Sequence, residues 1–286
     1  AITPLPTETI PLLQAGQRVL ATETQAKIDL PRFDNSAMDG YAVRAAEAIT
    51  GTKLKCIGEV SAGSVFEGEL GDGECLRIFT GSPTPDGANA VVMQEDTRAA
   101  SDLIEITDGV KPFEHIRLRG EDLKAGETIG HVGERLHAGR LQLFGSAGVA
   151  EVSVHRKPII GVLSTGDELR EPGDELGAGS IYESNRAALA ELIHQSGAEP
   201  RVYPLVHDTL EATTEALQTA FADCDAVVTS GGVSVGEYDF VKAAFEQLGG
   251  TLDFWKVQIK PGKPFVFGRL KGKPLFGVPG NPVSAM

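Results

Sequence analysis

The chain has 286 residues, of which 41% are hydrophobic and 23% charged, which is enough apolar material for two or three domains with cores of their own. Its formal net charge of −14 argues against a nucleic-acid-binding protein, and no apolar run approaches the roughly 20 residues that a membrane helix requires. The 3 cysteines are isolated from one another and no signal peptide opens the sequence, so we expect a protein of the reducing cytoplasm without a disulfide framework.

The charge is distributed unevenly along the chain. Residues 255–286 contain six cations and no acid, whereas the rest of the chain has twice as many acids as cations. An acidic protein with one cationic segment suits a small anionic ligand better than a polyanion.

The first part of the chain predicts a short helix over residues 15–22, followed by the loop PRFDNSAMDGYA at residues 31–42. Asp34-Asn35 and Asp39-Gly40 are turn-forming pairs with apolar side chains around them. The loop is either a surface turn fixed by its apolar neighbours or a segment that presents Asp39 to a ligand, as functional loops do.

Residues 53–132 show no helical period and predict an all-β domain, a small sandwich or barrel. Glycine- and proline-rich turns separate its short apolar runs, which are Leu54–Val60, Leu76–Thr80, Ala90–Met93, Leu103–Ile106 and Ile116–Leu118. Thr80-Gly81-Ser82-Pro83 ends one of these runs, and Asp122 lies in an acidic turn after the last. By their residue types alone, both segments are turns.

After a short helix expected near residues 139–149, the pattern changes to alternating strands and helices. The expected strands are 158–163, 201–206, 225–229, 252–257, 265–268 and 275–278, and the expected helices are 185–196, 209–221 and one that begins near Val241. This alternation predicts an open, largely parallel sheet with helices on both faces. Ligands of such sheets bind beyond the carboxyl ends of the strands.

The strand at 225–229 leads directly into the glycine-rich sequence SGGVSVGEYD, residues 230–239. A strand, a glycine turn and a helix start form an anion site, because glycine lets backbone N–H groups approach the ligand and the helix end adds partial positive charge. Asp239 has two interpretations: it complements the helix dipole, or it holds a divalent cation against a phosphate. Taken by itself, the loop favours the first.

Three more loops are expected at the same edge, at residues 165–169, at Asp208 and at 279–284, and KPGKP at residues 260–264 adds two lysines. Asp208 with Glu211 also resembles a capping box at the start of the helix 209–221. The convergence of anion-binding backbone, lysines and carboxylates nevertheless indicates a phosphorylated ligand with a metal. It therefore favours a ligand-binding role over a capping role for Asp208 and Asp239.

The sequence resembles the molybdopterin molybdenumtransferase family, which comprises the MoeA proteins and the E domain of gephyrin. Six motifs carry the resemblance in the family's order and span nearly the whole chain: DNSAMDGYA (34–42), FTGSP (79–83), STGDEL (164–169), SGGVSVGEYD (230–239), KPGKP (260–264) and PGNPVSA (279–285). Six ordered motifs are far more specific than a single glycine loop, and the form DNSAMDGYA is closer to bacterial members.

The resemblance implies an α/β fold class: a molybdopterin-binding three-layer α/β/α domain at residues 157–286, with a separate all-β domain at 26–126 and a small linking domain built from 1–25 and 127–156. It also implies an elongated homodimer whose active cleft is shared between the subunits. Members of the family begin with a further helix and continue past PGNPVSA into a C-terminal β domain that contributes to the molybdate pocket, so we expect the present sequence to be truncated at both ends.

The activity that the resemblance implies is the magnesium-dependent insertion of molybdate into adenylylated molybdopterin, with release of AMP, in molybdenum cofactor biosynthesis. Molybdate and adenylylated molybdopterin would be the substrates, Mg²⁺ the cofactor, and a molybdopterin adenylyltransferase the upstream partner, whereas no nucleic acid and no membrane is implied. Lysines and a bound cation would stabilise the charge that develops on the departing phosphate.

Site residues follow from the same motifs by resemblance. The catalytic residues would be Asp39, Glu168, Asp208, Asp239, Lys256 and Lys260, with Asp208 and Asp239 as the metal ligands. The residues expected to bind the pterin nucleotide or molybdate are Thr80, Thr165, Gly166, Asp167, Ser230, Gly231, Gly232, Val233, Ser234, Gly236, Lys263, Pro264, Gly280, Asn281, Pro282 and Ser284. Asp39 and Thr80 would reach the cleft of the partner subunit, and Asp122 is a further candidate of that kind.

Two other functions share part of this pattern. A molybdopterin adenylyltransferase shares the α/β fold and the SGG loop, but it is usually a single small domain, which residues 26–126 argue against. A gephyrin-like scaffold binds receptor peptides, but nothing in the sequence marks a peptide groove.

Overall fold

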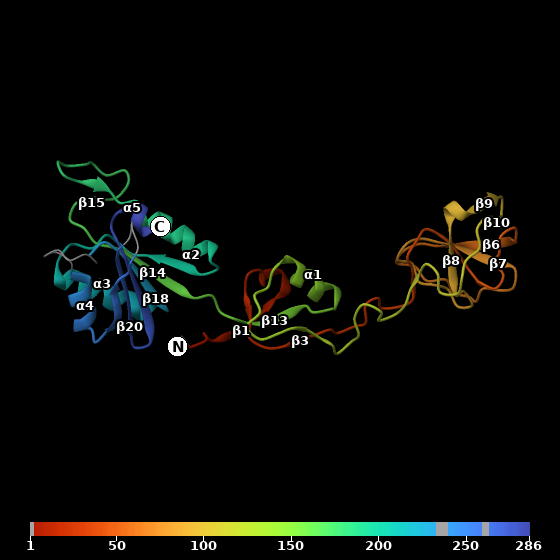
Figure 1. The fold of residues 1–286 in the computed structure, drawn as a ribbon, viewed down its shortest axis with the longest axis horizontal. Coiled ribbons are helices and arrows are strands. Elements are labelled where there is room, and N and C mark those ends of the chain that lie inside the picture. Colours follow the sequence, from red (N-terminus) through yellow and green to blue (C-terminus); the bar gives the residue numbers. More distant parts are fainter. Residues whose placement is uncertain (1–2, 233–239, 259–262) are drawn as a thin grey trace. The chain divides into compact units, whose positions relative to one another are not determined.

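The fold is that of a computed structural model, which describes residues 3–232, 240–258 and 263–286 (Figure 1). The chain divides into two compact units. The first unit comprises Ala1–Glu8 and Val154–Met286, and the second comprises Thr9–Ser153. Each unit is described here by itself.

A six-stranded sheet forms the centre of the first unit, in the order β17-β14-β18-β21-β20-β19. Its parallel part consists of β17 (Glu199–Val202), β14 (Ile159–Ser164), β18 (Ala226–Ser230) and β21 (Lys273–Val278). Two antiparallel strands extend it, β20 (Pro264–Leu270) and β19 (Thr251–Lys256). The expected open and largely parallel sheet is therefore confirmed.

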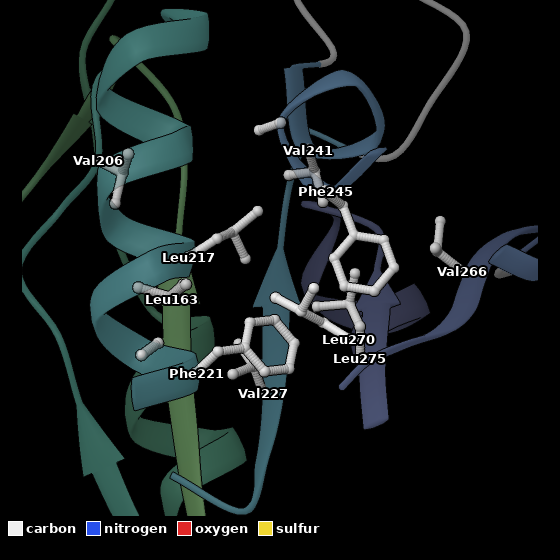
Figure 2. Packing of buried hydrophobic residues seen from close by; sticks show 12 residues of the cluster. Leu163, Val206, Leu217, Phe221, Val227, Val241, Phe245, Val266, Leu270 and Leu275 are labelled. Carbon is white, nitrogen blue, oxygen red and sulfur yellow. The ribbon is translucent and has the colours of Figure 1, made fainter. Parts of the chain in front are cut away.

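Helices cover both faces of this sheet. One side carries α3 (Leu210–Asp223) and α4 (Phe240–Gln247), while α2 (Asn185–Gln195) packs on β14 and β17 from the other side (Figure 1). Figure 2 shows the core under α3 and α4, where Phe221 and Phe245 lie 5.8 Å apart between ring centroids and meet Leu163, Val227 and Leu275 of the sheet. This arrangement is the three-layer α/β/α domain that the sequence predicts.

Smaller elements complete the first unit. They are the parallel pair β15 (Leu169–Arg170) and β16 (Ile181–Tyr182), and the four-residue helix α5 (Pro282–Ala285). In the part of the chain that the structure describes, no helix combines the length and the apolar character that crossing a membrane requires.

The second unit is built mainly of strands, as expected for residues 53–132. Its six-stranded sheet has the order β8-β5-β7-β6-β10-β9. The strands are β5 (Gly40–Val43), β6 (Lys53–Val60), β7 (Glu74–Ile78), β8 (Ala90–Met93), β9 (Thr97–Ala100) and β10 (Leu103–Ile106), with a 3₁₀ turn at Gln94–Asp96. Neighbouring residues of one strand, such as Ala42 and Val43, belong to different hydrophobic clusters, so both faces of the sheet are packed.

Short elements make up the rest of the chain. The strands are β1 (Thr7–Pro11), β2 (Val19–Leu20), β3 (Thr24–Gln25), β4 (Asn35–Ser36), β11 (Ile116–Arg117), β12 (Thr128–Gly130) and β13 (Glu151–His155), and the helices are α1 (Ala138–Ser146) and a 3₁₀ turn at Leu12–Gln14. The helix α1 confirms the one expected near residues 139–149.

Two expected elements are wrong. Residues 15–22 form no helix, because Gln17 has a positive φ of 64° and Val19 and Leu20 pair as β2 in a three-stranded sheet with β13. The strand expected at 201–206 is instead Glu199–Val202, and beyond it Val206 makes an isolated bridge to Thr165.

Gly40 explains why the DNSAMDGYA segment enters the sheet where it does. A Cβ atom at this position would lie 2.0 Å from the carbonyl oxygen of Val92 in the neighbouring strand β8. Only a residue without a side chain allows β5 to pair so closely with β8.

We therefore expect Gly40→Ala to lower the free energy of unfolding by about 1–3 kcal/mol or more, because the clash is with backbone that cannot rotate away. Urea unfolding measures this difference. The matched control is Gly58→Ala in β6, where the added Cβ would meet only Leu76 Cδ1 at 3.5 Å. Equal unfolding midpoints for the two variants would contradict the assignment.

Candidate functional site

The carboxyl ends of β14 and β18 bring two of the predicted loops together. Ser164 and Ser230 are register partners, and the Thr165 N–H donates to the Ser230 carbonyl at 3.1 Å. The Gly166 N–H donates to the Val206 carbonyl at 3.2 Å, which brings in the loop that carries Asp208. Three of the loops expected at this edge therefore meet within the first unit.

The glycine turn after β18 approaches Thr165 closely. Gly231 and Gly232 both have positive φ, 83° and 64°, and Cβ atoms there would lie 2.6 Å from the Thr165 carbonyl oxygen and 2.8 Å from Thr165 Oγ1. Glycine is required at both positions by backbone conformation and by space. Thr165 is buried, and its hydroxyl interacts with the Asp208 carboxyl, so these two polar groups lie together beside the turn.

Asp208 is not the cap of α3. Thr209 caps the helix, and its Oγ1 accepts from the Ala212 N–H at 3.2 Å, so the capping-box interpretation of Asp208 with Glu211 is wrong. Burial raises the pKa of the Asp208 carboxyl, and the negative charges of Asp167 and Glu168 raise it further. A cation at this position would relieve that repulsion.

Asp167 and Glu168 are exposed beside Asp208. Asp167 Oδ1 lies 2.9 Å from His207 Nδ1 and accepts from the Asp208 N–H at 3.3 Å, and these two hydrogen bonds lower the pKa of the Asp167 carboxyl. The Glu168 carboxylate folds back over Gly166, where a Cβ would lie 2.7 Å from Glu168 Oε2. Gly166 has a φ of 159°, a backbone conformation that residues with side chains rarely adopt, so the turn that presents both acids favours glycine.

The acidic groups fit a magnesium ion bound together with phosphate. Among the described residues, no three His, Cys, Asp or Glu side chains gather closely enough to form a protein-only metal site. Mg²⁺ in nucleotide sites usually takes one or two carboxylates, and substrate phosphates and water complete its shell. Asp208 can supply one carboxylate, whereas the second predicted ligand, Asp239, lies outside the described residues.

The PGNPVSA segment contributes backbone and a helix start. A Cβ on Gly280 would lie 3.7 Å from Gly231 Cα, so this loop adjoins the glycine turn. The Asn281 side chain accepts from the Val283 N–H at 3.0 Å and caps α5, which begins at Pro282 and includes Ser284. The structure therefore gives Asn281 a capping role.

The remaining predicted residues of this unit are placed only in part. Lys263 is exposed and Pro264 opens β20, opposite the backbone of Lys256. The predicted residues Val233, Ser234, Gly236 and Lys260, like Asp239, lie outside the described residues, as does the side chain of Lys256.

Three buried polar residues that the sequence analysis did not single out lie behind this edge: Glu183, Asn185 and Arg186, each 6–7% exposed. Glu183 accepts from the Ser164 hydroxyl at 3.1 Å, and Asn185 donates to the Ser230 hydroxyl at 2.7 Å. The one available signal was a run of polar residues at the start of a helix that must face the sheet, and this pattern is also typical of an exposed helix start.

In the second unit, the structure brings Asp39 and Thr80 together. Asp39 Oδ1 accepts from the Thr80 N–H at 2.8 Å and from the Thr80 hydroxyl at 2.7 Å. These two bonds, the backbone one first, lower the pKa of the Asp39 carboxyl. Asp122 forms an ion pair with Arg117.

Two family models match almost the whole chain. The model of the MoeA N-terminal region (domain I and II) matches residues 1–148, and that of a probable molybdopterin binding domain matches residues 161–286. The chain belongs to the molybdopterin molybdenumtransferase family. The family and the fold class that the sequence predicts are therefore confirmed.

Individual relatives agree with this membership. The molybdopterin molybdenumtransferase of Haemophilus influenzae is 42% identical and is matched over 99% of this chain and 70% of its own length, and that of Nostoc is 37% identical over 98% and 66%. The crystal structure of a molybdopterin biosynthesis MoeA protein from Pyrococcus horikoshii superposes with a TM-score of 0.82 at 34% identity, over 99% of this chain and 72% of that protein. The chain thus spans about two thirds of its relatives' length. At the level of the family, the prediction of a transferase of molybdenum cofactor biosynthesis is confirmed.

The hydrogen bonds between Asp39 and Thr80 should make the stability of the fold depend on pH. The pKa of Asp39 is lower in the folded protein than its ordinary value of 3.8. The two hydrogen bonds therefore stabilise the fold at pH values above the unfolded-state pKa. This stabilisation is lost as the pH falls through the folded-state pKa. We expect Thr80→Val to raise the pKa of Asp39 toward 3.8 and to lower stability slightly at pH 7, with the difference shrinking in acid. Carboxyl-carbon NMR of Asp39 measures the shift.

Thr84→Val is the matched control, because the Thr84 hydroxyl is buried without a partner in the described part of the chain. It should leave the Asp39 titration unchanged. An unshifted Asp39 pKa in Thr80→Val would show that the hydroxyl does not bind the carboxylate in solution.

Proposed function

We propose that this chain catalyses the magnesium-dependent insertion of molybdate into adenylylated molybdopterin, with release of AMP. The observation that supports this most is the convergence of Thr165, Asp208 and Gly231 at one sheet edge in a member of this family. A glycine turn, a hydroxyl and a carboxylate with a raised pKa are the groups that a pyrophosphate with a cation needs.

Binding of the pterin nucleotide is assigned to two loops, residues 165–168 and 230–236. The Thr165 hydroxyl lies at the turn and beside the Asp208 carboxyl, where it would donate to a phosphate oxygen. Gly231 and Gly232 keep side chains out of the space beside it. The turn therefore leaves space for a phosphate and presents polar groups that can bind it.

Asp208 and Asp239 are the proposed magnesium ligands, with Glu168 as a neighbouring catalytic residue. When bound, the cation would neutralise charge on the phosphate from which AMP departs. The chain's own contribution is to hold the Asp208 carboxylate next to Asp167 and Glu168, where repulsion disfavours an uncompensated charge and so favours cation binding.

Molybdate is assigned to the cationic segment and the loop that follows it. Lys260, Lys263 and Lys256 would supply the positive charge, with Pro264, Gly280–Pro282 and Ser284 around them. Ammonium groups are donors without acceptor capacity, so they suit a dianion such as molybdate and repel a cation. The segment 255–286 is free of acids, which supports this assignment.

The second unit would serve the same reaction from a partner subunit, through Asp39 and Thr80 in a homodimer with a shared cleft. We assign residues 157–286 to the molybdopterin-binding domain, 26–126 to the all-β domain, and 1–25 with 127–156 to the linking domain. A molybdopterin adenylyltransferase would deliver the substrate, and the protein would act in the cytoplasm.

The test is AMP release from adenylylated molybdopterin, assayed in the full-length protein with and without molybdate and magnesium. We expect release to require both additions. Asp208→Asn, which keeps the size of the side chain but removes its charge, should reduce the rate by about 100-fold or more and should raise the magnesium concentration needed. Glu211→Gln, an equal loss of charge three residues away, should leave the rate within about twofold.

Other outcomes would replace this function. Pyrophosphate release from ATP and free molybdopterin, without AMP release, would identify an adenylyltransferase. An intact fold with no affinity for pterin nucleotides would favour a scaffold. A native rate in Asp208→Asn would remove Asp208 from the metal site.

A further inference from the structure

A single buried amide joins the two loops that border the glycine turn. Asn185 is 7% exposed, and its Nδ2 donates to the Ser230 hydroxyl at 2.7 Å and to the Gly280 carbonyl at 2.8 Å. Both N–H bonds of one planar group are thereby used, which fixes the separation of the two acceptors. The Ser230 hydroxyl lies 3.4 Å from the Pro279 carbonyl, within reach of a further bond to the same loop.

Asn185 is itself held firmly. Glu183 Oε1 accepts from the Asn185 N–H at 2.8 Å and from the Ser164 hydroxyl at 3.1 Å, which ties the start of α2 to the end of β14. Arg186 Nε donates to Glu183 Oε2 at 3.0 Å and compensates its charge. A buried carboxylate with this many donors is rigid, because releasing any of them would leave a buried group unsatisfied.

This amide adds to the direct contact between the two segments, in which the Gly231 N–H donates to the Val278 carbonyl at 3.1 Å. Gly231 and Gly280 carry no side chains that could interlock, although a Cβ on Gly280 would lie only 3.7 Å from Gly231 Cα. Backbone segments without side chains are held in register by hydrogen bonds from elsewhere. In the described structure, Asn185 supplies such bonds to both loops.

We infer that Asn185 is a positioning residue that holds the Ser230–Gly232 turn and the Pro279–Gly280 loop at the spacing required to bind a phosphate-linked nucleotide. The inference rests on the proposed function, which assigns both loops to the substrate. It extends that function to a residue that touches neither the phosphate nor molybdate and acts only through Ser230 and Gly280.

The experiment measures the binding of AMP and ADP by calorimetry, together with kcat and KM for AMP release. Asn185→Ala removes both donors, and we expect ADP binding to weaken between ~10-fold and ~100-fold, with a matching rise in KM and a smaller change in kcat. Asn185→Asp keeps the side-chain volume but turns an acceptor toward the Gly280 carbonyl, so it should bind at least as weakly. If the alanine variant fails to fold, the aspartate variant decides the question.

Asp225→Ala is the control for a merely structural effect. Asp225 accepts from both terminal nitrogens of Arg156 at 2.6 Å and from the Ile159 N–H at 2.8 Å, at the opposite end of the same strands. It should lower the melting temperature and leave the ADP affinity within about twofold. A positioning residue must change affinity at a temperature where all variants are folded.

Different results would contradict the Asn185 inference and the proposed reaction. Native ADP affinity and KM in the folded Asn185 variants would overturn the inference while AMP release by the native chain still stood. Weakened ADP binding in these variants, with no AMP release from any form, would support the inference and refute the proposed reaction. A native chain that neither binds ADP nor releases AMP would overturn both.

Discussion

The site depends on the parallel pairing of three strands that end at the same level. Ser164 of β14 lies opposite Ser230 of β18, and Ser230 lies opposite Val278 of β21. Because these strands are parallel, the loops that follow them start from one edge and face the same space. Hydrogen bonds beyond the strands continue the pairing, from the Thr165 N–H to Ser230 and from the Gly231 N–H to Val278. The binding edge is therefore held by the same backbone hydrogen bonding as the sheet itself.

The two helical layers that cover the sheet differ in the residues that they bury. Under α3 and α4 the core is apolar, and Phe221, Phe245 and the side chains around them need no orientation beyond good packing (Figure 2). The start of α2 buries polar groups beside Leu189, and each of Glu183, Asn185 and Arg186 has several partners. Buried polar groups with complete hydrogen bonding specify one geometry, which is what the loops at a binding edge require.

Much of this arrangement could be predicted from the sequence. The strand and glycine turn at Ser230, the loop after β14 and the all-β unit follow from local patterns, because buried strands and glycine turns leave strong signals. The errors arose where a neighbouring residue takes the expected role or where tertiary contacts outweigh local preference. Thr209 caps α3 in place of Asp208, and Gly40, read as part of a turn, lies in strand β5.

The positions of Glu183 and Asn185 could not be predicted, for a related reason. Polar residues at a helix start are usually exposed caps, and only the sheet topology shows that this start is buried against β14 and β18. The contact between Asp39 and Thr80 joins residues 41 positions apart, and the sequence gives no measure of such a distance. Motif resemblance identified both residues, but their hydrogen bonds come from the pairing of β5 with β7.

The central claim, that the aligned strand ends form the nucleotide site, is tested most directly by a crystal structure of the protein with AMP and Mg²⁺ bound. The account predicts the phosphate within hydrogen-bond distance of the Thr165 hydroxyl, at the turn formed by Gly231 and Gly232, with the cation on Asp208. AMP bound at another surface, without contact to Thr165 and with Asp208 free of the ion, would contradict it.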